Sequence, residues 1–209
     1  MKTIIYKVGG SLLDLPDLAS RLLIAIEQNS DSRPLLVLGG GRAADVVREW
    51  DRIHHLDEES SHWLALDAMR LNESFLQNIL PNSRIVTTRQ EAQATWDASG
   101  IPILSSGEFL RAEESTSRFL LPHTWDVTSD SIAAWIALQW PADGLVLLKS
   151  ASPPDNFASF VEGVSIETNS VDPYFFRLAS DLPSIDWLNL RADERIRANQ
   201  REQFHHWMD

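Results

Sequence analysis

The sequence predicts an α/β protein, a three-layer αβα sandwich around a mostly parallel central sheet. Short, almost fully apolar runs alternate with longer segments in which apolar residues recur every three or four positions. Uninterrupted apolar runs are typical of parallel strands covered on both faces, and helices normally connect such strands. The first two apolar runs also end in glycines, at Gly9 and at Gly39. In open parallel sheets these corners gather at the carboxyl edge, where ligands bind.

Composition and charge limit the kinds of partner that this chain is expected to bind. The chain has 209 residues, of which 44% are hydrophobic and 23% charged, and we expect one domain over residues 1–209. Its formal net charge is -12, so we expect no nucleic-acid or membrane partner, because both favour basic surfaces. No apolar run approaches the roughly 18 residues of a membrane span and no signal peptide is recognisable, so we expect a cytoplasmic protein. The absence of cysteine excludes disulfides.

The first two strand–helix units carry the glycines. Residues 3–8 predict a strand, and the helix after it is expected to be capped by Asp14. Residues 34–38 predict the second strand, which is followed by three consecutive glycines and a helix over 42–52.

The rest of the chain continues the alternation. Asp57 is expected to begin a long helix that ends near Leu80. The later elements are expected to be a strand at 85–87, a helix over 90–98, a strand over 100–104, a helix capped by Thr128 or Ser129, a strand over 144–149, a strand or hairpin over 161–168, a short helix capped by Asp172, a strand over 184–190 and a helix over 191–209. Residues 105–122 have no clear period, and we expect irregular structure there.

Lysine is rare in this chain, and two lysines end apolar runs. The lysines are Lys2, Lys7 and Lys149. A lysine on a buried strand is costly unless it meets an anion, so Lys7 and Lys149 are candidates for holding phosphoryl oxygens. A composition biased towards arginine is the competing explanation. Asp130 lies in the first turn of a predicted helix, where a carboxylate can also simply complement the helix dipole.

Four segments carry a family resemblance: Lys7 to Ser11, Gly39 to Gly41, Asp126 to Ala133 and Leu145 to Lys149. Their order and spacing resemble the amino acid kinase superfamily, which includes aspartate, glutamate, uridylate and carbamate kinases. The resemblance implies a carbamate kinase-like sandwich that transfers the γ-phosphoryl group of ATP, with Mg²⁺, to a carboxylate, carbamate or phosphate oxygen. It implies an acceptor half over about 1–125 and a nucleotide half over about 126–209. Such proteins commonly dimerise, so we expect a homodimer or a higher homo-oligomer.

The resemblance also implies roles for individual residues. The catalytic residues would be Lys7, Asp130 and Lys149, with Lys7 on the transferring phosphoryl group and Asp130 orienting the lysines. The nucleotide would contact Gly9, Gly10, Ser11, Ser129 and Ser150. The small anionic acceptor would contact Gly39, Gly40, Gly41, Arg42, His54, Asp126 and Thr128. No residue spacing predicts a metal site formed by the protein itself.

The histidines allow two interpretations. A histidine among His54, His55 and His62 would contact an acceptor phosphate, as one does in isopentenyl phosphate kinases, or would lie on the surface where a helix starts. His123, which shortly precedes Asp126, is a second candidate for facing the acceptor.

Two segments, Trp125 to Ala133 and Val171 to Phe175, look most like a small branch linked to methanofuran biosynthesis. The activity studied in that branch phosphorylates an aminomethylfuran phosphate. After Lys149, however, the chain has Ser150 and a proline-containing loop where many members have Thr-Asp and a glycine loop over the nucleotide. The usual lysine-bearing helix is also missing. A non-catalytic nucleotide- or oxyanion-binding protein on the same fold is therefore the alternative hypothesis.

Overall fold

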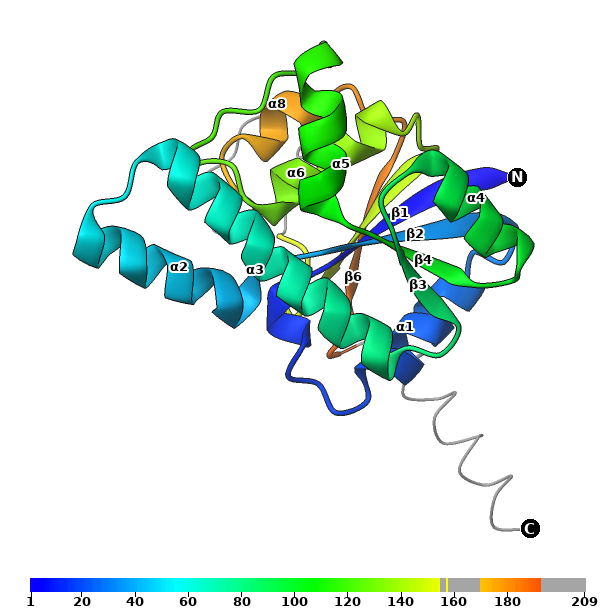
Figure 1. The fold of residues 1–209 in the computed structure, drawn as a ribbon. Helices are drawn as coiled ribbons and strands as arrows, with labels where there is room; N and C mark the ends of the chain where they lie inside the picture. Colours follow the sequence, from blue (N-terminus) through cyan, green and yellow to red (C-terminus); the bar gives the residue numbers. More distant parts are fainter. Residues whose placement is uncertain (155–156, 158–169, 193–209) are drawn as a thin grey trace.

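A computed structural model describes residues 1–154, 157 and 170–192 of the chain, and these form an α/β structure with a parallel sheet (Figure 1). The strand order is β3-β4-β2-β1-β5-β6, and every pair of neighbours is parallel. The strands are β1 (Lys2–Val8), β2 (Ser32–Leu38), β3 (Ser83–Val86), β4 (Ile101–Leu104), β5 (Gly144–Lys149) and β6 (Ile185–Asn189). Helices flank the sheet, so the predicted fold class is confirmed.

The helices follow most of the predicted segments. They are α1 (Leu18–Glu27), α2 (Gly41–His54), α3 (Glu58–Ile79), α4 (Arg89–Asp97), α5 (Ser106–Glu113), α6 (Ser129–Gln139) and α8 (Phe175–Ala179), with short 3-10 helices η1 (Gly10–Leu12) and η2 (Glu114–Thr116). Asp57 caps α3 as expected, because its carboxylate accepts from Ser60 N at 2.8 Å. None of the helices in the described ranges is long and apolar enough to cross a membrane.

Side-chain alternation along the strands builds one core on each face of the sheet. Ile5, Leu145 and Leu147 belong to the core on the α6 side, whereas Tyr6 and Leu148 belong to the other core. Lys7 pairs with Leu147 in the parallel register of β1 and β5. Because side chains alternate with a period of two, Lys7 and Lys149 both fall on the α6 face.

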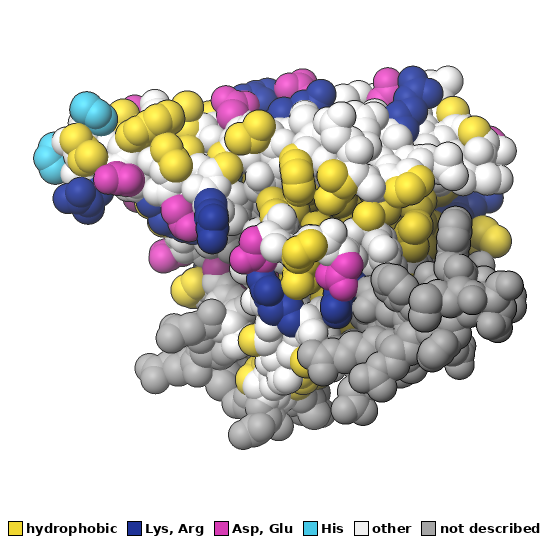
Figure 2. Space-filling model, turned by 90° about the horizontal axis from the view of Figure 1, so that it is seen from below, with side chains coloured by type: hydrophobic (Ala, Val, Ile, Leu, Met, Phe, Trp, Pro, Cys, Tyr) yellow, Lys and Arg dark blue, Asp and Glu magenta, His cyan; other side chains and the backbone are white. Residues whose placement is uncertain are grey.

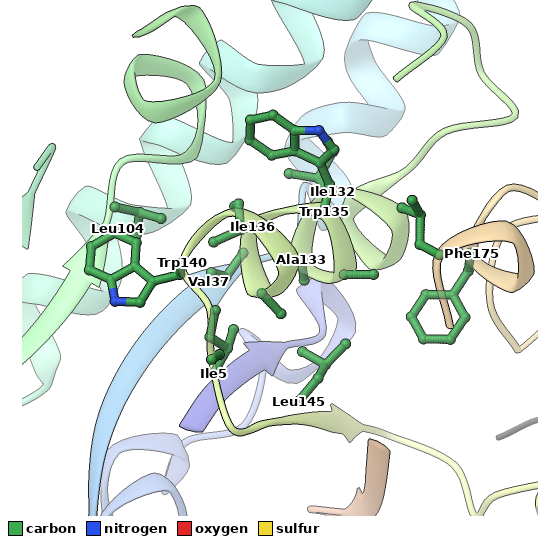
Figure 3. Close-up of a cluster of buried hydrophobic side chains, with 14 of the residues drawn as sticks. Ile5, Val37, Leu104, Ile132, Ala133, Trp135, Ile136, Trp140, Leu145 and Phe175 are labelled. Atoms are coloured by element: carbon green, nitrogen blue, oxygen red, sulfur yellow. The ribbon is translucent and has the colours of Figure 1, made fainter. Parts of the chain in front are cut away.

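Helix α6 lies at the centre of the first core and is buried nearly all round. Ile132, Trp135 and Ile136 are at most 4% exposed, and Figure 3 shows them packed among side chains of the sheet and of α8. The small residues Ala133 and Ala134 are fully buried and let the helix approach the strands closely. This packing fixes the first turn of α6, which carries Asp130.

Some expectations about elements were wrong. Residues 106–113 form α5 where irregular structure was expected, because the helix is too short to show a clear period although Phe109 and Leu110 are buried. Helix α1 begins at Leu18 with Asp17 at its N-cap position, so Asp14 does not cap it. The expected strand or hairpin over 161–168 and nearly all of the expected helix over 191–209 lie outside the described residues.

Candidate functional site

Two glycine turns meet at the carboxyl edge of β1 and β2. Gly39 N donates to Val8 O at 2.8 Å, which joins the ends of the two strands. A Cβ on Gly10 would lie 2.2 Å from Gly41 N, and Gly41 has a φ of +48°. Since no side chain fits at either position, glycine is what lets the two turns touch at the start of α2.

Asn72 on α3 fixes the second glycine turn. Its Nδ2 donates to Gly39 O at 2.7 Å and to Gly40 O at 2.8 Å, and the side chain is buried. The sequence analysis missed this residue, because nothing local in a long helix distinguishes an asparagine that faces a distant turn.

The Asp130 carboxylate bridges two lysines. Its Oδ1 lies 2.8 Å from Lys7 Nζ, and its Oδ2 accepts from Lys149 Nζ at 2.7 Å. Lys149 also donates to Ser170 O at 2.8 Å. Lys7 and Asp130 are buried, with exposed fractions of 3% and 5%. The structure therefore brings together the residues that the sequence singled out at the ends of two strands and the start of a helix.

Burial and charge set the protonation of this cluster. Burial alone would raise the pKa of Asp130, but the two ammonium groups hold it below its ordinary value. Burial, and then the positive charge of Lys7, lower the pKa of Lys149 to about 8, against the opposing effect of Asp130. At neutral pH the carboxylate is ionised, and Lys149 is a cation close to its titration point.

Asp172 organises the first turn of α6. Its carboxylate accepts from Thr128 N at 3.0 Å, from Thr128 Oγ1 at 2.7 Å and from Ser131 N at 3.0 Å. It also accepts from Phe175 N, the first residue of α8, at 3.0 Å. The expectation that Asp172 caps this helix directly was wrong, because α8 begins at Phe175 and Tyr174 occupies its N-cap position. The expectation that Thr128 or Ser129 caps α6 was wrong: Thr128 occupies the N-cap position without a side-chain capping bond, and the capping acceptor is Asp172.

The ends of β1 and β5 are also joined. Ser11 Oγ lies 3.0 Å from Ser150 Oγ, and Gly9 N donates to Leu148 O at 2.9 Å. The predicted nucleotide-binding residues of the first turn and of the strand bearing Lys149 are thus neighbours, on the same edge as the lysine cluster.

A cavity of about 150 Å³ opens beside the glycine turns, between α2, α3 and the segment that leads into α6. Gly40 and Gly41 at the start of α2 line the cavity, and so do Thr128 and Ser129 at the start of α6. One face of α3 forms a wall, with Glu58, Ser61, His62, Ala65, Leu66 and Met69. Helix N-termini favour anions, so the end of the cavity nearest Asp130 suits an anionic group.

Four predicted acceptor residues do not line this cavity. Gly39 is buried within the turn, against Gly10 and Ser129. His54 is exposed at the last residue of α2, roughly 20 Å along the helix axis from Gly41, and does not line the cavity. Asp126 is exposed and also lies outside the cavity lining, although its neighbours Trp125 and Val127 belong to it. Arg42 instead borders a second, more open cavity with Gly10, Ser11 and Gly41. Among the histidines in the described part of the chain, His62 is the one that lines the first cavity.

Comparisons with known proteins agree with this arrangement. The family model described as "Amino acid kinase family" matches residues 2–152. The curated [5-(aminomethyl)furan-3-yl]methyl phosphate kinase of Methanocaldococcus jannaschii is 28% identical over 133 residues, which cover 63% of this chain and 58% of that protein's length.

Solved structures resemble the fold over nearly its whole length. The uridylate kinase of Archaeoglobus fulgidus has a TM-score of 0.61 at 19% identity and covers 95% of each chain. The UMP kinase of Ureaplasma parvum has a TM-score of 0.63 at 16% identity and covers 90% of each chain. Because the family model matches most of the length of this chain, the chain belongs to the amino acid kinase family.

Proposed function

We propose that this chain is a kinase that transfers the γ-phosphoryl group of ATP to a phosphate or carboxylate oxygen of a small metabolite. The observation that carries the proposal is the buried bridge of Lys7, Asp130 and Lys149 beside the two glycine turns. Family membership and the kinase relatives support it. Because the matching curated protein is named for it, an aminomethylfuran phosphate is the first acceptor to test.

The chemistry of phosphoryl transfer fits this cluster of charges. The reaction depends mainly on positioning and on neutralising charge that is spread over the phosphoryl oxygens. An acceptor oxygen attacks the γ-phosphorus while the bond to the β–γ bridging oxygen breaks, and that oxygen leaves on ADP. A phosphate or carboxylate acceptor is already an anion, so no general base is required. Lys7 and Lys149 would bind the phosphoryl oxygens, and Asp130 would hold both ammonium groups in place.

The residues present offer contacts for ATP but few ligands for a metal ion. ATP would contact the backbone amides of the first glycine turn and the Ser11–Ser150 pair. Mg²⁺ would neutralise phosphate charge, and it is usually held by substrate phosphates with only one or two carboxylates. Both oxygens of Asp130 contact lysines, and the described residues contain no cluster of three or more metal-ligating side chains. The metal would therefore enter with the nucleotide.

We also propose that the chain assembles with a second copy through α2 and α3. Several large apolar side chains are at least 37% exposed on these helices: Val46, Trp50, Ile53, Leu71, Phe75 and Ile79. From below, hydrophobic side chains are interspersed with charged ones on the surface (Figure 2). The Phe75→Glu variant should then shift the chain to a lower mass in light scattering.

Because ATP is the proposed donor, we also propose that the chain works in the cytoplasm.

The proposed activity is tested by measuring ADP release with Mg²⁺-ATP and a panel of acceptors. The panel contains an aminomethylfuran phosphate, isopentenyl phosphate, acetylglutamate and carbamate. Lys7→Ala should abolish acceptor-dependent ADP release, whereas Lys2→Ala, an exposed lysine at the start of the same strand, should not. Full turnover by Lys7→Ala would overturn the mechanism. Saturable ATP binding without turnover on any acceptor would favour the non-catalytic alternative.

A further inference from the structure

His62 lies at the end of the cavity away from the lysine cluster. It precedes Asn72, which holds the Gly39–Gly40 turn, by ten residues on α3. Ten residues of helix span roughly 15 Å, so an acceptor in this cavity would present to His62 a part that is remote from the reacting oxygen. Its side chain is 7% exposed, and its Nε2 is buried without a hydrogen-bond partner among the described residues. The neighbouring Ser61 Oγ is likewise buried without a hydrogen-bond partner among the described residues.

His123 stacks on His62 and is held as a cation. Its Nδ1 lies 2.5 Å from Glu59 Oε2, and its Nε2 lies 2.9 Å from Glu114 Oε1. Ionised carboxylates only accept hydrogen bonds, so both ring nitrogens donate, which requires the imidazolium form. Burial opposes this charge, but the two carboxylates outweigh it and raise the pKa of His123.

Burial and the stacked His123 cation together keep His62 uncharged. The two ring centroids are 4.0 Å apart and the ring planes differ by 6°. A second positive charge at this distance is unfavourable. Burial, then His123, lower the pKa of His62 to about 4, with Arg111 of α5 acting in the same direction and Glu59 opposing. The uncharged Trp63 ring makes a T-shaped contact with each of the two imidazoles.

The other cations near this end of the cavity already have carboxylate partners, Asp45 for Arg48 and Glu108 for Arg111. Arg48 is the only lysine or arginine among the described residues that line the cavity. Its guanidinium donates to Asp45 Oδ1 at 2.8 Å and lies 4.8 Å from the centre of the Trp125 ring. Glu58 adds another carboxylate to the same wall. The cavity thus offers helix N-termini for an anion at one end and a neutral-to-negative surface at the other.

We propose that His62, as a neutral imidazole stacked on the His123 cation, selects the remote end of the acceptor. It favours a remote end that is neutral or carries an ammonium group over one that carries a second anion. His123 is the positioning residue, because it acts only through His62. The cavity volume of about 150 Å³ matches one small ring, since a cavity of about this size holds a benzene molecule. This inference rests on the proposed kinase function of the same cavity.

The first test measures the protonation of His62 directly and does not require kinase activity. In protein with isotope-labelled histidine, NMR titration should show that His62 stays neutral down to about pH 5. Glu114→Gln removes one carboxylate from His123 and should shift the His62 titration upward. Glu113→Gln is the matched control, because Glu113 pairs with Arg89 instead. A wild-type His62 that titrates near its ordinary value would overturn the inference.

The second test compares two acceptors that share a ring and a phosphate. One is a furan methyl phosphate with an aminomethyl group, and the other carries a carboxylate in its place. Wild type should bind the amine at least tenfold more tightly at pH 6, measured by calorimetry without ATP. Glu114→Gln should lose several-fold of this preference as the pH falls, and His62→Gln combined with Glu114→Gln should restore a pH-independent preference. Equal binding by wild type would overturn the inference.

Turnover separates this inference from the proposed function. If wild type binds the amine selectively but releases no ADP, the kinase proposal fails while the selection by His62 stands. If ADP is released equally well with both acceptors, the kinase proposal stands and the selection by His62 is wrong.

Discussion

Lys7 Nζ lies 2.8 Å from Asp130 Oδ1, and both side chains are almost completely buried. Lys149 contacts the other oxygen of the same carboxylate. Burying charges is expensive, and an arrangement of this kind is stable only while each charge keeps its partners. Asp130 is therefore required for folding stability as well as for the orientation of the two lysines.

Asp130→Asn should destabilise the fold by about 3–5 kcal/mol, the usual cost of leaving a buried ion without its partner. Turnover should fall at least a hundredfold under conditions where the variant is folded, because the two ammonium groups repel each other once the carboxylate is gone. Urea denaturation measures the first effect and ADP release the second. Asp126→Asn, an exposed aspartate of the segment before α6, is the control. A stability equal to wild type would contradict the prediction.

Gly10→Ala should separate the two glycine turns. The added Cβ would lie 2.2 Å from Gly41 N, so the backbone at the start of α2 must move. We expect ATP and acceptor affinities to fall together by at least tenfold, because one displacement disturbs both sites. Calorimetric titration measures both. In Gly107→Ala the Cβ would meet its nearest atom at 3.4 Å inside helix α5, so this control should bind normally; normal binding by Gly10→Ala would disprove the close contact.

The parts of the fold and site that the sequence predicts are those with local signals. Apolar runs, glycine corners and the strand ends at Lys7 and Lys149 are each readable within a few residues, and strand periodicity then places both lysines on one face. The start of α6 at Asp130 carries its own helix signal. Parallel pairing brings these separate local features to one edge of the sheet.

The parts that the sequence does not reveal depend on contacts between distant segments. Asp172 caps α6 from beyond β5, and Asn72 holds a turn from the middle of a uniform helix. The choice between His54 and His62 depends on which face of α3 meets the cavity and on where α2 ends, and neither follows from composition. The wall of the cavity that is remote from the lysines is therefore known only from the structure, whereas the edge that carries the lysines is predicted from the sequence.

Asp172→Ala should weaken both the fold and acceptor binding. It removes the acceptor for Thr128 N, Ser131 N and Phe175 N, and a lost helix cap alone costs about 0.5–2 kcal/mol. Because the first turns of two helices lose this acceptor, we expect a total of about 1–4 kcal/mol in urea denaturation. Thr128 and Ser129 line the cavity, so the acceptor KM should rise more than kcat falls. Asp186→Ala, on the exposed side of β6, is the control; an unchanged KM would mean that the cap does not position the cavity wall.

Lys149 should make ATP binding depend on pH. Its pKa of about 8 in the free protein means that it is protonated at pH 7 and largely neutral at pH 9. Bound phosphate oxygens favour the charged form, so binding at pH 9 should take up about one proton, whereas binding at pH 7 should take up almost none. Calorimetry in buffers of different ionisation enthalpy measures this uptake, and affinity should fall as the pH rises through 8. Lys149→Arg stays charged throughout and should show neither effect. Proton uptake that is equal in wild type and in this variant would assign the titration to another group.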